Sequence, residues 1–192
     1  MNLGSIAEEI VVCTRCDLHK SRQRAVPGEG SGKARIMLVG EAPGKDEDEQ
    51  GFPFVGRSGK LLDKWIRTYL GKSRDDVYIA NVCKCRPPEN RNPSWEEMQS
   101  CLPFLHQQVQ VVQPHVIMTL GSIAAKALSE DKSLAITKIR GSAKRMTVGE
   151  TETIWLPTYH PAYLLRNGSK DNQEAVKEDF LKAAKILRKL AS

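Results

Sequence analysis

Three short segments of the 192-residue sequence carry side chains suited to acid–base chemistry or to recognition of a polar ligand. The first begins with Gly40-Glu-Ala-Pro-Gly44 and continues through an acidic stretch to residues 52–56, the second starts at Asn81, and the third at Tyr159-His160. A carboxylate can stabilise a developing cation, and an imidazole can donate a hydrogen bond to developing negative charge. Turns and solvated loops use the same residue types, but their combination predicts an active site.

Two further side chains favour a binding role over a structural one. The Asn81 amide is both donor and acceptor, so it could read the polar edge of a base. Phe54 stands between Pro53 and Gly56, which indicates a loop, where an aromatic ring is more typical of a stacking platform than of a core. His160 precedes a proline, which restricts its backbone to extended conformations.

The five cysteines are the other group of reactive side chains. Cys13 and Cys16 form a C-x-x-C motif after a predicted N-terminal helix, a context that favours a metal site over a thioredoxin-type redox pair. Cys85 and Cys101 are the natural further ligands, whereas Cys83 adjoins a predicted strand and is interpreted as a core residue. Four thiolates suit either zinc or a [4Fe–4S] cluster, and the spacing does not decide between them.

The elements that must position these residues alternate between strand and helix, which predicts an α/β domain with a parallel sheet covered on both faces. The three polar segments follow predicted strands, and in such sheets the active site lies beyond the carboxyl ends of the strands. Apolar runs predict strands at Arg35–Val39, Val77–Ala80, His115–Leu120 and Thr153–Pro157. Apolar periodicity and capping residues predict helices at Leu3–Val12, Ser58–Leu70, Ser94–Val112, Ser122–Leu128 and Asn172–Leu190.

Composition excludes several protein classes. The chain is 40% hydrophobic and 27% charged, which argues against disorder, collagen and coiled coil. Its longest apolar runs are too short to span a bilayer, and its first ten residues hold two glutamates and no basic residue, unlike a secretory signal. We therefore expect a soluble, cytoplasmic protein without disulfides. The net charge of +6 weakly favours a polyanionic partner.

The ordered motifs resemble the family 4 uracil-DNA glycosylases, the iron–sulfur branch of the uracil-DNA glycosylase superfamily. The matching motifs are GEAPG (40–44), PFVG (53–56), N-x-x-K-C-R-P-P (81–88) and HPAYLLR (160–166), preceded by the C-x-x-C. The resemblance implies one three-layer α/β domain over residues 1–192, with a central, mainly parallel four-stranded sheet and an N-terminal segment tied by a structural [4Fe–4S] cluster. It implies hydrolysis of the N-glycosidic bond of a flipped-out uracil, with no lyase step.

The resemblance also implies roles for individual side chains. Uracil would stack on Phe54 and pair through its polar edge with Asn81, so that cytosine, with the inverse pattern, binds badly. His160 would donate to uracil O2, and the backbone of the loop that contains Ala42 and Gly44 would assist.

The motifs leave three candidates for the catalytic carboxylate, because Ala42 stands where the best-known uracil-DNA glycosylases carry an aspartate. Glu41 is the first candidate for stabilising the oxocarbenium-like sugar and orienting water. Glu47 is the second, although the resemblance also places it beside uracil C5, where it would exclude the thymine methyl group. Asp48 is the third, and the roles of Glu41 and Glu47 could be exchanged.

The remaining implied contacts concern the cluster and the DNA. We expect a monomer acting on uracil-containing DNA, single- or double-stranded. The implied cluster ligands are Cys13, Cys16, Cys85 and Cys101. The implied DNA contacts are an apolar wedge, Tyr163, Leu164 and Leu165, with Arg166, Lys84, Arg86, Arg91 and the basic residues Arg15, Lys20, Arg22 and Arg24 near phosphates.

Three alternative protein classes fit the sequence less well. A superfamily branch that cross-links to the abasic sugar carries a histidine-bearing basic insertion, which residues 87–93 lack. A branch with a broader base range has GEAPA, whereas this chain has Gly44. A non-catalytic nucleic-acid-binding module with a four-cysteine metal site would explain the charge and the cysteines, but not the polar residues at the predicted strand ends.

Overall fold

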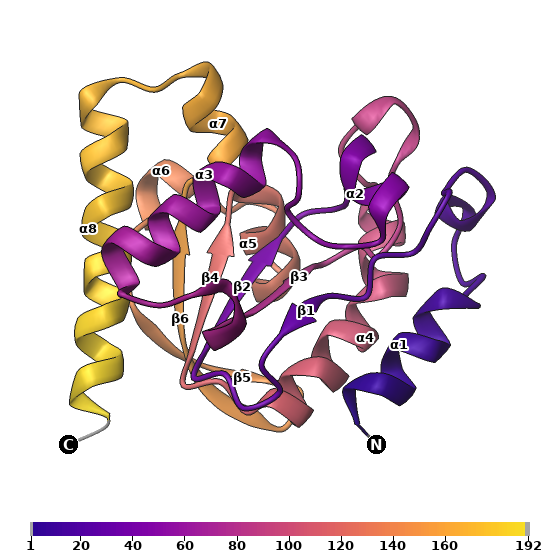
Figure 1. Ribbon diagram of the computed structural model, residues 1–192, viewed down its shortest axis with the longest axis horizontal. Coiled ribbons are helices and arrows are strands. Elements are labelled where there is room, and N and C mark those ends of the chain that lie inside the picture. Colours follow the sequence, from indigo (N-terminus) through magenta and orange to yellow (C-terminus); the bar gives the residue numbers. More distant parts are fainter. Residues whose placement is uncertain (1, 191–192) are drawn as a thin grey trace.

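The centre of the molecule is a six-stranded β-sheet with the order β1-β3-β2-β4-β6-β5 (Figure 1). This computed structural model describes residues 2–190, so Met1 and residues 191–192 of the expected domain lie outside the described residues. The four inner strands pair in parallel and match the four that the sequence predicts. They are β2 (Ile36–Gly40), β3 (Tyr78–Asn81), β4 (Val116–Leu120) and β6 (Thr151–Thr158).

The expected total of four strands is wrong, because an antiparallel strand is added at each edge of the sheet. The strand β1 (Glu29–Gly30) pairs with β3, and β5 (Lys144–Val148) pairs with β6. Neither edge strand has the apolar run of a buried strand: β1 is two residues long, and only Val148 of β5 is fully buried.

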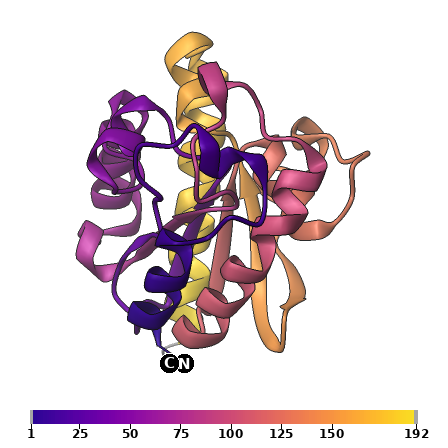
Figure 2. The same ribbon diagram turned by 90° about the vertical axis from the view of Figure 1, so that its right-hand side faces the viewer.

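Helices cover both faces of the sheet, as expected for a three-layer α/β domain (Figures 1 and 2). Side chains of β2 alternate between the faces: Met37 and Val39 join one hydrophobic cluster, and Ile36 and Leu38 join the other. The first cluster is covered by α1 (Leu3–Val11), α4 (Trp95–Val112) and α5 (Ser122–Ser129). The second is covered by α3 (Arg57–Trp65), its continuation Ile66–Leu70, α7 (Pro161–Arg166) and α8 (Lys170–Lys189).

Local sequence signals explain where α4 and α2 begin. At the start of α4, Ser94 and Glu97 form the predicted capping box, and the helix continues through the exposed Pro103. The acidic stretch, for which the sequence predicted no helix or strand, forms the short helix α2 (Lys45–Gln50). Acidic residues in its first turn interact favourably with the positive end of the helix dipole.

Shorter elements complete the chain. They are α6 (Ile136–Ile139) and the 3₁₀ turns Asp17–Lys20, Arg74–Asp76 and Pro88–Asn90. Within residues 2–190, no helix combines the length and the apolar character needed to cross a membrane.

Candidate active site and cysteine cavity

A cavity of about 510 Å³ lies at the carboxyl ends of the four parallel strands. Its lining includes Glu41 directly after β2, Asn81 at the end of β3, Gly121 directly after β4, and His160 just beyond β6. This is the edge near which α2 and α7 lie in Figure 1. Of the site residues predicted from the sequence, the structure brings Glu41, Ala42, Gly44, Glu47, Phe54, Asn81, His160 and Arg166 together here.

Phe54 and Asn81 approach each other closely because residue 40 is a glycine. A Cβ atom at Gly40 would collide with the Asn81 side-chain oxygen and with the Phe54 ring. The Phe54 ring centroid lies 5.7 Å from that of His160, and the backbone at Phe54 has a φ of 52°, which is uncommon for a residue with a side chain. Surrounding contacts must therefore hold Phe54 in this conformation.

Arg74, which the sequence analysis did not identify, supplies such contacts. Its guanidinium donates to the carbonyl oxygens of Pro53 and Phe54, the latter at 3.2 Å. It also forms ion pairs with Glu29 and, at 2.7 Å, with Asp63. Arg74 lies 20 positions from Phe54 in a segment without a motif, so no signal in the sequence pointed to this contact.

Asn81 is buried, with 2% of its surface exposed, and its Oδ1 atom has no hydrogen-bond partner among the described residues. Such an oxygen without a partner carries a desolvation penalty of about 1–3 kcal/mol. A ligand that placed an N–H group against Oδ1 would remove this penalty. The cavity therefore presents a buried acceptor that lacks a donor.

His160 is held as a neutral hydrogen-bond donor. The backbone N–H of Ala162 donates to Nδ1 at 3.0 Å, so in the neutral ring the proton is on Nε2. Burial lowers the pKa of His160 to about 4, which keeps the ring neutral near pH 7. Gly121, with a φ of 93°, permits this packing, because a Cβ atom there would lie 2.9 Å from His160 Cβ.

The three candidate carboxylates have different environments. Burial raises the pKa of Glu41 to about 7, and no donor bonds to its carboxylate among the described residues. Glu47 instead braces two loops, because it accepts hydrogen bonds from the backbone N–H groups of Gly44, Val55 and Gly56 at 2.9–3.1 Å. Asp48 is buried and accepts from the N–H groups of Gln23 and Arg24.

The residues of the expected apolar wedge, 163–165, lie on α7, partly at the surface and partly in the core. Leu165 is 42% exposed and Arg166 is exposed at the rim of the cavity. Leu164 is 7% exposed and packs in the second hydrophobic cluster, so its expected place in a surface wedge is wrong. Tyr163 is half-buried, with its ring centroid 5.0 Å from that of Tyr159.

Lys84 does not occupy the surface position expected of a phosphate contact. It is 1% exposed, and its Nζ atom donates to the backbone oxygen of Asn81 and to Gln108 Oε1, each at 2.7 Å. Burial lowers the pKa of Lys84 to about 8. The expectation is wrong because the ammonium group bonds to two internal acceptors, and these bonds offset the cost of removing the charge from water. Arg86 is half-buried and donates to Asn90 Oδ1 at 2.8 Å.

Four of the five cysteines line a second, small cavity: Cys13, Cys16, Cys85 and Cys101. Cys83 is fully buried and does not line it. Within residues 2–190, no group of three or more Cys, His, Asp or Glu side chains is arranged so that it could hold a metal ion, so a metal site is not shown.

Hydrogen-bond donors nevertheless point at three of these sulfur atoms. The Arg22 guanidinium donates to Cys85 Sγ at 3.0 Å, the Lys84 backbone N–H to Cys101 Sγ at 3.2 Å, and the Arg15 N–H to Cys13 Sγ at 3.5 Å. Such donors stabilise thiolate ligands and tune iron–sulfur centres. The chemistry of these donors, with four cysteines around one cavity, fits a cluster.

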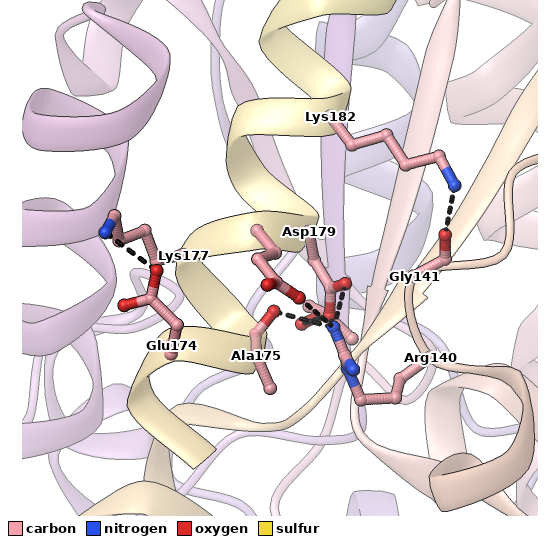
Figure 3. A network of polar contacts seen from close by, with 9 residues as sticks. Arg140, Gly141, Glu174, Ala175, Lys177, Asp179 and Lys182 are labelled. Carbon is pink, nitrogen blue, oxygen red and sulfur yellow. Dashed lines mark hydrogen bonds and ion pairs between the residues drawn. The ribbon is translucent and has the colours of Figure 1, made fainter. Parts of the chain in front are cut away.

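A buried ion pair fixes the end of β6, next to the His160 loop (Figure 3). Asp179 of α8 is 1% exposed and accepts from Arg140 at 2.5 Å and from the Thr158 hydroxyl at 2.7 Å. Lys182 donates to the backbone oxygen of Gly141, which joins α8 to the segment that carries Arg140, before β5. This network anchors the last residue of β6, two positions before His160.

Known proteins resemble this chain over almost its whole length. The family model described as the uracil DNA glycosylase superfamily matches residues 27–185. A type-4 uracil-DNA glycosylase of Sulfurisphaera tokodaii is 44% identical over 188 residues, covering 96% of this chain and 84% of that protein. One of Thermotoga maritima is 44% identical, with 96% and 94% covered, and one of Pyrobaculum aerophilum is 46% identical, with 86% of each covered. The chain therefore belongs to the uracil DNA glycosylase superfamily and, within it, to the type-4 uracil-DNA glycosylases.

Proposed function

We propose that this protein excises uracil from DNA by hydrolysing the N-glycosidic bond, which releases free uracil and leaves an abasic site. The observation that carries the proposal is the buried, unpaired Oδ1 atom of Asn81 in the same cavity as Phe54 and His160. Uracil presents an N3–H donor beside the O4 acceptor, so Asn81 accepts from N3–H and donates to O4. Cytosine presents the inverse pattern and leaves the buried amide unpaired.

His160 and the surrounding helices stabilise the leaving base. Negative charge collects on uracil O2 as the bond breaks, and the Nε2–H of neutral His160 donates to it without a prior proton transfer. The first residues of α3 and α5 also line the cavity, so the positive ends of these helices favour the same charge. Phe54 stacks against the flipped base.

Glu41 acts on the sugar side of the bond. Its carboxylate, when ionised, stabilises the oxocarbenium-like sugar and orients the attacking water. Glu47 and Asp48 are less suited to this task, because backbone N–H groups already occupy their oxygens. Water is the nucleophile, so the reaction stops at the abasic site without a lyase step.

We also propose that Cys13, Cys16, Cys85 and Cys101 hold a structural [4Fe–4S] cluster. When bound, the cluster supplies four iron–thiolate bonds that join α1 and the following turn to the loop after β3 and to α4. Glycosidic hydrolysis transfers no electrons, so the cluster takes no part in the proposed chemistry.

The surface around the cavity suits DNA. Three basic side chains at its rim can contact phosphates, and the exposed Leu165 can enter the duplex in place of the flipped base. The substrate is uracil-containing DNA, single- or double-stranded, and the protein acts as a monomer. The three residues are Lys45, Arg57 and Arg166, whereas Arg91 at the same rim is paired with Glu97.

One experiment tests the activity. The protein is incubated with a labelled oligonucleotide that contains one uracil, and abasic sites are then cleaved with alkali. Wild-type protein cleaves this strand but not a matched strand with cytosine or thymine at that position, and Asn81→Ala loses most of the activity. Binding of the uracil strand without any strand breakage would refute the proposed excision activity and would support a non-catalytic DNA-binding module.

A further inference from the structure

Lys84 lies between the two cavities, and each of its polar groups has a structural partner. Its backbone N–H donates to Cys101 Sγ at 3.2 Å, and its backbone oxygen accepts from the N–H of Val26 at 2.7 Å. Its Nζ atom donates to the Asn81 oxygen and to Gln108. One residue thus connects the end of β3, the helix α4 and the N-terminal segment.

The contact with Asn81 closes a short turn directly below the proposed uracil site. Backbone bonds of 2.9 Å hold the turn, from the Val82 N–H to the Gly40 oxygen and from the Cys83 N–H to the Glu41 oxygen. These bonds attach the residues that follow Asn81 to the loop of Glu41. The Lys84 ammonium fixes the remaining peptide group, because it binds the Asn81 carbonyl oxygen at 2.7 Å.

Gln108 holds the ammonium group in this position. Its Nε2 atom donates to the Pro27 oxygen at 2.7 Å and to the Tyr78 hydroxyl at 3.2 Å, so its Oε1 atom must face Lys84. Gln108 and Lys84 are each 1% exposed. Lys84 and Gln108 therefore form a buried, fully bonded pair that contacts the backbone of Asn81.

We propose that Lys84 is a positioning residue for uracil recognition. By fixing the Asn81 carbonyl, it fixes the direction in which the Asn81 amide points into the cavity. This inference rests on the proposed pairing of Asn81 with uracil. It assigns Lys84 to base recognition rather than to the phosphate contact that the sequence indicated.

The test is Lys84→Met, which keeps the length of the side chain but removes the ammonium group. The dissociation constant of free uracil is measured by calorimetry, and that of an undamaged labelled oligonucleotide by fluorescence anisotropy. We expect the affinity for uracil to fall about tenfold, as for loss of one charged hydrogen bond, while the affinity for DNA stays within about twofold of wild type. Lys185→Met, on the exposed side of α8, is the matched control and leaves both constants unchanged. Wild-type uracil affinity in Lys84→Met overturns the inference.

A destabilised control separates positioning from stability. Val109→Ala opens a cavity in the first hydrophobic cluster, so it lowers thermal stability without removing a contact of Lys84. Its uracil affinity should stay at the wild-type level; an equal loss of uracil affinity in Val109→Ala would make the effect of Lys84→Met merely structural and overturn the proposal. If wild-type protein neither binds nor excises uracil, the proposed function itself fails, and the inference with it.

Discussion

The environment of Glu41 predicts a specific dependence of the excision rate on pH. Burial raises the pKa of Glu41 to about 7, and the proposed mechanism requires the ionised carboxylate. Below pH 7 the ionised fraction falls about tenfold per pH unit, so the rate at pH 5 is about one hundredth of the plateau reached above pH 8. The titration of His160 does not change the rate in this pH range, because its pKa lies at about 4 and its neutral form is the active one.

The assay is a single-turnover measurement with protein in excess over a uracil oligonucleotide, at constant ionic strength, from pH 5 to pH 9. Abasic sites are cleaved with alkali after timed quenching. Glu41→Gln is the matched variant, because it keeps the shape but cannot ionise. Its residual rate should be low and independent of pH. A flat profile in the wild type, or the same rising limb in Glu41→Gln, would refute the assignment.

The same pKa shift acts on stability in the opposite direction. Because the pKa of Glu41 is raised on folding, its contribution to the free energy of unfolding is fully present below the unfolded value of 4.5 and is lost as the pH rises through 7. Activity therefore increases over the pH range in which this contribution disappears. Ionised Glu41, the form that the proposed mechanism requires, therefore stabilises the folded protein less than protonated Glu41 does.

Three further variants test other parts of the structure. Asp179→Asn leaves Arg140 with only the longer, exposed ion pair to Glu178 at 3.8 Å and should lower the free energy of unfolding by about 3 kcal/mol in urea denaturation; an unchanged midpoint would contradict the role of the Arg140–Asp179 pair. Gly40→Ala places a methyl group against Asn81 and Phe54, so calorimetry should find weaker uracil binding than in the wild type, and equal affinity would count against the cavity geometry. Cys85→Ala should remove the visible absorption of the purified protein and lower its melting temperature, and surviving colour would disprove the ligand assignment.

The sequence predicts the inner part of the fold well, because the local pattern determines it. The runs around Ile36 and Val116 are apolar on both faces, as buried parallel strands require, and the strand ends gave the position of the cavity. The strand β5 has no such pattern, since Lys144 and Arg145 are exposed at the edge of the sheet. Its pairing with β6 depends on the neighbouring strand rather than on its own apolar residues.

Prediction of side-chain roles failed where the deciding contacts are distant in the sequence. Lys84 looked like a surface cation, but its burial depends on Gln108, 24 positions away. Glu47 was the second candidate for the catalytic carboxylate, and its sequence neighbourhood did not show that the N–H groups of Val55 and Gly56 bond to one of its oxygens. Residue type and spacing identified which segments form the site, whereas the task of each side chain depended on which groups the fold placed beside it.

The cysteine cavity has a consequence for how the chain is made. Cys13 and Cys16 precede every strand of the sheet, whereas Cys101, on α4, follows two of the four parallel strands. Arg22 and its sulfur partner Cys85 are 63 positions apart. During synthesis the thiols of Cys13 and Cys16 cannot meet that of Cys101 until 85 further residues have followed Cys16. The segment that holds Cys13 and Cys16 therefore reaches its position through contacts between residues far apart in the sequence, which form slowly during folding.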